Sequence, residues 1–266
     1  MNPANIELLL FLLVTASYAA AWLVHLLGWR QNSAAKTALA TYIAWAGITV
    51  HVGLLSMRWY LSGHVPFLSA FEFVNFFAFL VMLVFLLFSR REHNRMLGVF
   101  LLPVGLALML YASLLDRVIE PEIPIFASFL LKLHVLTTLI GYAAWAITFA
   151  ASVCFLYLDK RGRENPGLFD RLAYKAAFIA FSFLTVGIVT GALWGDRVFG
   201  QLWFWDPKET WSFITWLIFM AYLHARYTLD WRGRRAAILA IVGFAAVLFT
   251  YIGVDFLLPQ IHGRQG

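Results

Sequence analysis

One short segment of the chain combines aromatic and charged residues in a way that an ordinary connection does not need. Residues 194–211 read WGDRVFGQLWFWDPKETW and contain four tryptophans, two phenylalanines and five charged residues. A connection between apolar stretches requires only polar and turn-forming residues, whereas exposed indoles suit a large, planar, apolar ligand. The segment therefore predicts a ligand site, and haem is the candidate ligand.

Several histidines could serve as iron ligands near this segment. A neutral imidazole is a common axial ligand of haem iron. His134 lies about two turns into one apolar stretch and His262 follows the last one, so both could approach the segment, while His224 lies toward the inner end of another stretch. Each of these residues could instead be a hydrogen-bonded packing residue, and that alternative is stronger for His51 and His64.

The aromatic and acidic residues also have purely structural explanations. Tryptophans anchor helix ends at membrane surfaces, which is sufficient for a residue such as Trp59, but anchoring does not require the order W-x-W-D-P-K-E. Asp206 before Pro207 predicts a helix N-cap. Ser69 and Glu72 fit a capping box, and this explanation is sufficient for Glu72. Caps would explain the carboxylates but not the indoles.

The composition predicts an integral membrane protein. The chain has 266 residues, of which 62% are hydrophobic and 13% are charged, whereas about a quarter of the residues of a soluble protein are charged. The apolar stretches lack the alternation of barrel strands, so we expect an all-α fold of about eight transmembrane helices in one bundle, residues 1–266 forming a single polytopic domain. The expected spans are 6–28, 37–57, 69–88, 96–115, 128–158, 176–193, 211–229 and 236–257.

The distribution of basic residues predicts the orientation. Lysines and arginines concentrate on alternate connections, such as residues 159–175, which indicates that these connections are cytoplasmic. Both termini and residues 194–211 would then lie on the external or periplasmic face. This sidedness explains the net charge of +6 without a nucleic-acid partner. The single cysteine, Cys154, excludes an intrachain disulfide and a C-x-x-C-H haem attachment site.

The chain resembles the CcsA/ResC family of System II cytochrome c biogenesis, whose members carry a tryptophan-rich WWD domain. The strongest match is WFWDPKETW, residues 203–211, which continues to His224. Weaker matches are SGHVPFLSAFE, KLHVLTTLIGYAA with His134, and YIGVDFLLPQIHG with His262. The chain departs from the family pattern at Phe199, where a tryptophan is frequent, and at Asp255, where an uncharged polar residue is common.

The resemblance implies a set of haem contacts. Haem b would be bound transiently, as a substrate, by an external WWD loop at residues 194–211, and the loop residues implied are Trp194, Trp203, Trp205, Asp206 and Trp211. His134 and His262 would be the axial ligands of the haem iron. His224 would lie on the delivery route within the membrane. The resemblance does not assign roles to His51 or His64.

The resemblance also implies an activity and partners. The chain would be a multi-pass protein of the bacterial cytoplasmic membrane and a component of a haem lyase complex, presenting haem for thioether attachment to apocytochrome c. Its partners would be a CcsB/ResB-type membrane subunit, apocytochrome c, thiol-reducing assembly proteins and the lipid bilayer. The alternatives are CcmC-like haem delivery without ligation, a HemX-like role in regulating haem synthesis, and a membrane transporter. The P-K-E-T-W sequence after Asp206 favours the CcsA/ResC branch over CcmC.

Overall fold

The computed structural model describes residues 2–89, 95–119, 122, 124–162 and 166–257. Within these ranges every regular element is helical, which confirms the predicted all-α fold. The chain divides into two compact units, residues 1–126 and residues 127–266. The eight expected spans are therefore distributed over two units of four, and each unit is described separately below.

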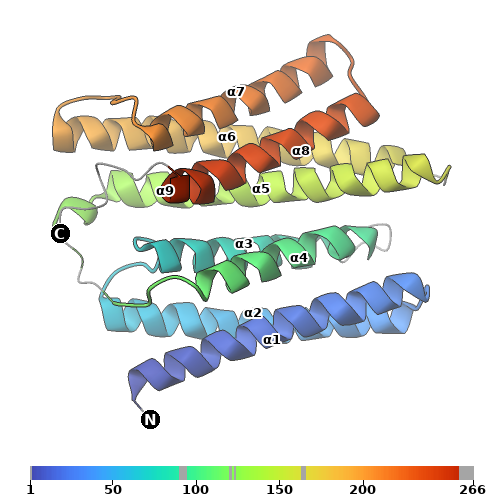
Figure 1. Cartoon of the computed structure of the whole chain (residues 1–266), viewed down its shortest axis with the longest axis horizontal. Helices are drawn as coiled ribbons and strands as arrows, with labels where there is room; N and C mark the ends of the chain where they lie inside the picture. Colours follow the sequence, from blue (N-terminus) through green and yellow to red (C-terminus); the bar gives the residue numbers. More distant parts are fainter. Residues whose placement is uncertain (1, 90–94, 120–121, 123, 163–165, 258–266) are drawn as a thin grey trace. The chain divides into compact units, whose positions relative to one another are not determined.

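Unit 1 contains four long helices among its described residues, and these are labelled in Figure 1. They are α1 (Pro3–Arg30), α2 (Ala34–Ser62), α3 (Ala70–Ser89) and α4 (Arg95–Ala112), followed by a short 3₁₀ turn, η2 (Pro124–Phe126). The packed face of α1 recurs every three or four residues, as expected for a helix with one buried stripe. Its buried residues are Glu7, Phe11, Val14, Tyr18, Ala21, His25 and Gly28.

Unit 2 also contains four long helices among its described residues. They are α5 (Phe129–Lys160), α6 (Pro166–Phe199), α7 (Pro207–Thr228) and α8 (Arg234–Leu248), and α8 continues into a π-helix, η3 (Phe249–Gly253), and the short α9 (Val254–Leu257). Trp145 of α5 is fully buried, stacks on Phe219 of α7 at 3.4 Å between ring centroids, and donates its indole N–H to the carbonyl oxygen of Ala240 in α8 at 3.0 Å. One side chain thus joins three helices.

The helices are those of a multi-pass membrane protein. Six of the described helical segments are long and apolar enough to cross a bilayer: α1, α2, α3, α5, α6 and α8 with η3. The apolar part of α4, Met96–Ala112, is shorter. Helix α7 has 22 residues but carries Lys208, Glu209 and Arg226 together with several Ser, Thr and Trp residues, so it falls outside this group of six.

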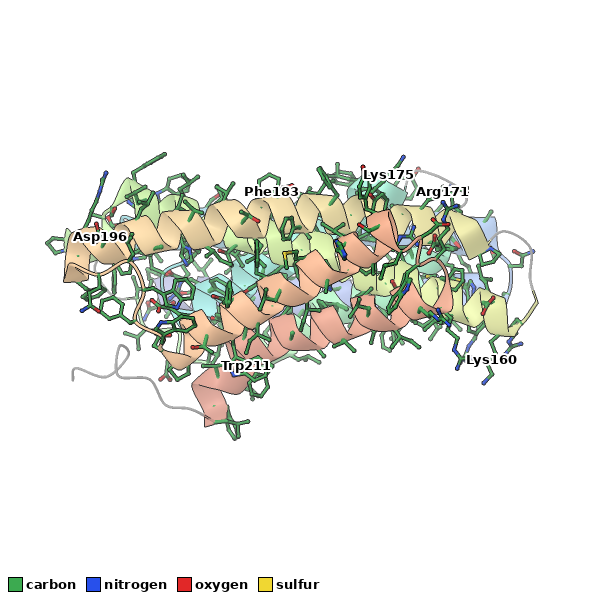
Figure 2. The ribbon with its side chains drawn as sticks, turned by 90° about the horizontal axis from the view of Figure 1, so that it is seen from above. Lys160, Arg171, Lys175, Phe183, Asp196 and Trp211 are labelled. Carbon is green, nitrogen blue, oxygen red and sulfur yellow. The ribbon has the colours of Figure 1, made fainter. Side chains whose placement is uncertain are left out.

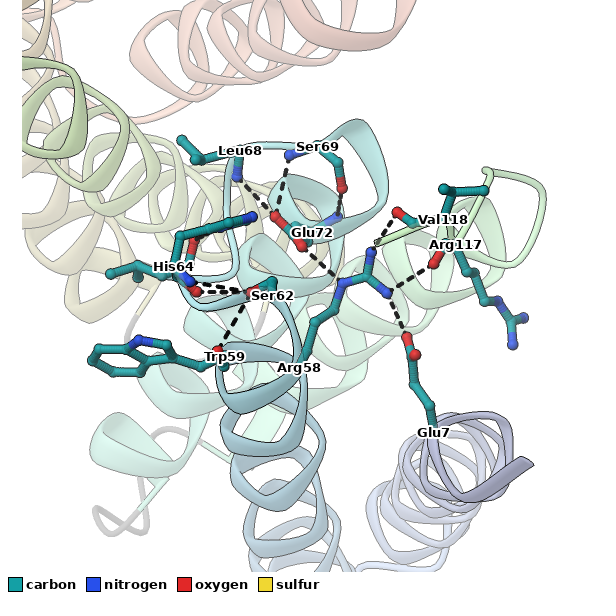
Figure 3. A network of polar contacts seen from close by, with 11 residues as sticks. Glu7, Arg58, Trp59, Ser62, His64, Leu68, Ser69, Glu72, Arg117 and Val118 are labelled. Carbon is teal, nitrogen blue, oxygen red and sulfur yellow. Dashed lines mark hydrogen bonds and ion pairs between the residues drawn. The ribbon is translucent and has the colours of Figure 1, made fainter. Parts of the chain in front are cut away.

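A buried ion cluster fixes one end of unit 1 (Figure 3). The Arg58 guanidinium is fully buried, and it lies 2.6 Å from Glu7 Oε1 and 2.8 Å from Glu72 Oε1. It also donates to the carbonyl oxygens of Arg117 and Val118, each at 3.1 Å. These contacts join α1, α2, α3 and the segment after α4. A buried charge requires such complete pairing because its desolvation is costly.

Glu72 therefore has two roles, of which only one was predicted. Its backbone N–H donates to Ser69 Oγ at 3.2 Å, and its Oε2 accepts from the backbone N–H groups of Leu68 and Ser69. This confirms the predicted capping box. Its second role is also structural, because its other carboxylate oxygen pairs with Arg58.

A second buried polar cluster lies within the helices of unit 1. His51 Nε2 lies 2.9 Å from Asn75 Oδ1, and the Tyr18 hydroxyl lies 2.8 Å from His51 Nδ1. Because an amide oxygen only accepts, Nε2–H donates to Asn75 and Nδ1 accepts from Tyr18. Both ring nitrogens of His51 are thus occupied by protein groups, which favours a packing role for this histidine.

The ion cluster predicts a large loss of stability when its cation is removed. Arg58→Met leaves the carboxylates of Glu7 and Glu72 buried without their counter-charge, and we expect a cost of about 3–5 kcal/mol. Arg232→Met is a matched control because Arg232 and Asp230 form an ion pair in which both side chains are 73% exposed, and such pairs contribute at most about 1 kcal/mol. Thermal unfolding of the two variants in detergent measures the difference. Equal midpoints would contradict a stabilising role for the cluster.

Candidate functional site

The segment between Trp194 and Trp211 is mostly helical, and its irregular part is short. Helix α6 continues to Phe199, and the chain leaves the helix at Gly200, which has a φ of +74°. Residues 200–206, here called the tryptophan loop, connect it to α7, which begins at Pro207. The expected loop spanned residues 194–211, but Asp196 and Arg197 lie on an exposed helical surface and do not interrupt α6. Glycine marks the end of the helix because it adopts the left-handed conformation without steric cost.

Two carboxylates fold the tryptophan loop against the start of α7. Asp206 is the N-cap, as predicted, and its Oδ1 accepts the backbone N–H of Glu209 at 2.7 Å. Glu209 Oε2 reaches back to accept the backbone N–H of Phe204 at 2.7 Å. The Thr210 hydroxyl donates to the carbonyl oxygen of Trp205 at 3.3 Å. The loop conformation is thus held by side chains that the first turn of α7 supplies.

These contacts hold Trp205 in a conformation that side chains rarely adopt. Its φ is +56°, in the left-handed region that costs an L-residue about 1–2 kcal/mol. Its side chain is nevertheless 68% exposed, so packing does not compensate for the strain. Strained backbone held by surrounding contacts is found frequently at binding sites. The exposed position of the Trp205 indole thus goes together with an unfavourable backbone conformation.

Two aromatic rings contact this indole, and further aromatic residues pack against one another near the loop. The Trp203 ring lies edge-on to Trp205 at 5.9 Å and to Phe213 at 6.3 Å, measured between centroids. Trp194 contacts Phe199, which in turn contacts Phe204 of the loop. Trp211 packs on a different element, at 4.2 Å from Phe249 of η3.

The orientation of the His134 ring is fixed by α6. Its Nδ1–H donates to the carbonyl oxygen of Gly187 at 2.7 Å, which leaves the lone pair on Nε2. The imidazole lies so close to α6 that a Cβ at Gly191 would be 2.6 Å from Nδ1. A backbone carbonyl that accepts one ring N–H is one of the usual partners of a metal-ligating histidine, besides carboxylates and water. The tautomer of the ring is therefore fixed, with Nε2 as the unprotonated nitrogen.

His134 and the start of α7 share one end of unit 2. Lys208, two residues after the loop, is close enough to His134 to interact with it electrostatically. The Lys208 ammonium also lies 5.2 Å from the centre of the Tyr251 ring in η3. In Figure 2, Asp196 and Trp211 lie toward one end of this unit, and Lys160, Arg171 and Lys175 lie at the other.

The remaining predicted histidines are placed differently. His224 is exposed near the end of α7, thirteen residues after Trp211 and hence about 20 Å away along the helix, with its Nδ1 3.4 Å from the Thr228 hydroxyl. The structure thus does not bring His224 to the tryptophan loop. His262 lies outside the described residues. His64, in unit 1, is buried and donates Nδ1–H to the carbonyl oxygen of Val65 at 3.0 Å.

Three contributors to the site were missed in the sequence. Capping is a sufficient explanation of Glu209 in the sequence, although a carboxylate at the third position of a helix that follows an aromatic loop can also hold that loop in place. Gly187 and Gly191 recur at a spacing of four residues, which brings two helices into close contact in membranes. That spacing, GIVTG, could have located the α6 surface facing His134.

The indole of Trp203, which is partly buried, indicates whether the loop suits a polar, aromatic ligand. Its Nε1 is buried and has no hydrogen-bond partner in the structure. Buried N–H groups are nearly always paired, so an orphan requires an explanation. A planar ligand with peripheral oxygen atoms, as haem has, fits an exposed indole, a buried donor and an imidazole with an available lone pair.

Comparisons with known proteins agree with the predicted family. The family model described as cytochrome C assembly protein matches residues 67–262. A protein of Gloeobacter violaceus named cytochrome c biogenesis protein CcsA is 30% identical, and the alignment covers 98% of each chain. A Chlamydomonas reinhardtii protein of the same name is 36% identical over 79% of this chain, which spans 63% of that protein's length.

A solved structure has a similar fold. The structure named cytochrome c heme lyase CcmF matches 94% of this chain with a TM-score of 0.74, and the match covers 47% of that chain. At 19% identity this likeness concerns the fold alone. The family match over most of the chain and the CcsA relative that is aligned over its full length confirm the resemblance, and the chain belongs to the cytochrome c assembly protein family.

Proposed function

We propose that this protein acts in cytochrome c biogenesis by binding haem at the tryptophan loop and presenting it for covalent attachment to apocytochrome c. The observation that carries the proposal is the arrangement at one end of unit 2. His134 has its lone pair on Nε2, and the nearby loop holds the exposed indole of Trp205. An axial ligand and an aromatic platform are the two parts that a surface haem site requires.

The haem is proposed to be haem b, held transiently as a substrate. His134 is one axial ligand and His262, in the C-terminal segment, is the second. Trp203 and Trp205 contact the porphyrin, and Trp194 and Trp211 support the aromatic surroundings through Phe199 and Phe249. Asp206 acts indirectly, because it caps α7 and so holds the loop.

The proposed chemistry demands positioning rather than acid–base machinery. Each thiol of the apocytochrome segment adds across one haem vinyl group, so that a C–S bond and a C–H bond form while the S–H bond and the π bond of the vinyl C=C break, with no net oxidation or reduction. Holding haem and thiols in register can lower the barrier by about 7–11 kcal/mol. A rigid loop braced by Glu209, and a histidine fixed by Gly187, supply such positioning on the haem side.

The proposed setting is the bacterial cytoplasmic membrane, with the tryptophan loop on the external face. The basic residues Lys160, Arg171 and Lys175 lie at the opposite end of unit 2, as expected for the cytoplasmic side (Figure 2). His224 is on the same helix as the loop but nearer that end, which supports a place on the delivery route. The proposed partners are a CcsB/ResB-type membrane subunit, apocytochrome c and thiol-reducing assembly proteins. This chain would be a component of the haem lyase complex, and apocytochrome c would be its substrate.

The direct test is an absorption spectrum of the protein purified in detergent, oxidised and reduced. We expect a haem spectrum with axial histidine ligation, and its loss or alteration in His134→Ala, with partial recovery when imidazole is added. A colourless wild-type protein that also fails to bind added haem would contradict the proposed function.

Because α6 lies close to the His134 ring, we expect Gly191→Ala to displace this proposed iron ligand without removing it. The added Cβ would lie 2.6 Å from His134 Nδ1, so the imidazole must move and haem occupancy should fall several-fold. Gly53→Ala is the matched control, because a Cβ at Gly53 meets no atom within 4 Å. Haem absorbance relative to protein absorbance measures occupancy. Wild-type occupancy and an unchanged spectrum in Gly191→Ala would argue against His134 as the ligand.

The strain at Trp205 predicts opposite effects on stability and binding. Trp205→Gly relieves the left-handed conformation, so we expect the variant to be about 1 kcal/mol more stable and yet to retain less haem. Trp59→Ala, which removes an indole that is 54% exposed in α2, should leave haem retention unchanged. Thermal unfolding and haem retention during dilution provide the two readouts. Full haem retention in Trp205→Gly would reduce this residue to a membrane anchor.

A further inference from the structure

The buried N–H of Trp203 differs from two other indole donors of unit 2, one in a buried and one in a partly buried side chain. Trp145 donates to the carbonyl oxygen of Ala240 at 3.0 Å, and Trp216 donates to the Thr185 hydroxyl at 2.9 Å. Folding therefore provides acceptors for indoles even inside a helical membrane unit. Trp203 Nε1 is buried without any acceptor. Its place in the loop next to the exposed Trp205 indicates that the acceptor belongs to a ligand.

The surroundings of Trp203 restrict the kind of acceptor. The ring lies among the aromatic rings of Trp205 and Phe213, which suit an apolar, flat molecule rather than a hydrated ion. An acceptor that reaches this N–H must therefore be attached to such a molecule. The two propionate carboxylates of haem are oxygen acceptors at the edge of a flat, apolar ring system.

The local charges also suit a carboxylate. The loop leads into the N-terminus of α7, where the helix dipole is positive, and Lys208 adds a cation in the first turn. Asp206 and Glu209 are acidic, but each accepts a backbone N–H of the cap, from Glu209 and Phe204 respectively, so both are directed into the protein's own structure.

We propose that Trp203 Nε1 donates a hydrogen bond to a propionate carboxylate of haem and so sets which edge of the porphyrin faces the loop. The inference rests on the proposed haem-binding function. It assigns different tasks to the two neighbouring tryptophans: Trp205 offers its face to the porphyrin, and Trp203 offers its N–H to the carboxylate. With a propionate edge fixed at Trp203, the vinyl-bearing edge is directed away from this contact.

The test compares haem with haem dimethyl ester, in which both carboxylates are esterified and uncharged. Trp203→Phe keeps an aromatic ring but removes the N–H. We expect this variant to bind haem about tenfold more weakly than the wild type does, with little change for the ester. Trp205→Phe makes the same chemical change at the exposed indole and should weaken both ligands to the same extent. Lys208→Gln, a second variant, should lower haem affinity and spare the ester.

The possible outcomes distinguish a failure of the proposed Trp203–propionate contact from a failure of the proposed haem-binding function. Equal weakening of haem and ester in Trp203→Phe, or no weakening of either, would overturn the propionate contact while wild-type haem binding upheld the haem site. A wild-type protein that binds neither ligand would overturn both. Thermal unfolding of Trp203→Phe without ligand checks the fold. We expect no loss of stability, because the N–H that is removed makes no hydrogen bond in the protein.

Discussion

The need to satisfy backbone N–H groups where the chain enters a helix shapes both units of this protein. Lipid offers no hydrogen-bond partners, and helix ends leave several donors unpaired. In unit 1, Glu72 accepts from the backbone of Leu68 and Ser69 and fixes the loop before α3. In unit 2, Glu209 accepts from the backbone of Phe204 and fixes the loop before α7. In both units, a glutamate in the first turn of a helix thus fixes the loop that precedes the helix.

The surroundings of the two glutamate carboxylates differ. Glu72 is buried against Arg58, whose guanidinium also binds Glu7, so the first loop is part of a closed structural cluster. Glu209 is only partly buried and holds a loop that carries a strained, exposed indole. The same capping chemistry therefore supports stability in one unit and, as we propose, ligand presentation in the other.

Much of the fold and part of the site could be predicted from the sequence, because apolar periodicity and caps are local signals. The helices, the N-cap at Asp206 and the capping box at Ser69 follow from residues within one turn of each other. The ion pair between Glu7 and Arg58 could not be predicted, because it joins residues 51 positions apart. The orientation of His134 was hidden for the same reason, since its partner, Gly187, lies on another helix. The length of the irregular loop was overestimated because charged residues on an exposed helical turn resemble a loop in sequence.

The described buried polar contacts of unit 1 join residues of that unit alone, and this affects how the protein can fold during synthesis. The described side-chain partners of Arg58 and the carbonyl groups that it binds all lie between Glu7 and Val118, and the Tyr18, His51 and Asn75 contacts lie within the same range. During synthesis on the ribosome, these groups can pair before residue 127 and the second unit have emerged. The first four helices can thus be inserted and packed as one cotranslational step, and the half of the chain that carries the proposed haem site enters a membrane in which its companion unit is already folded.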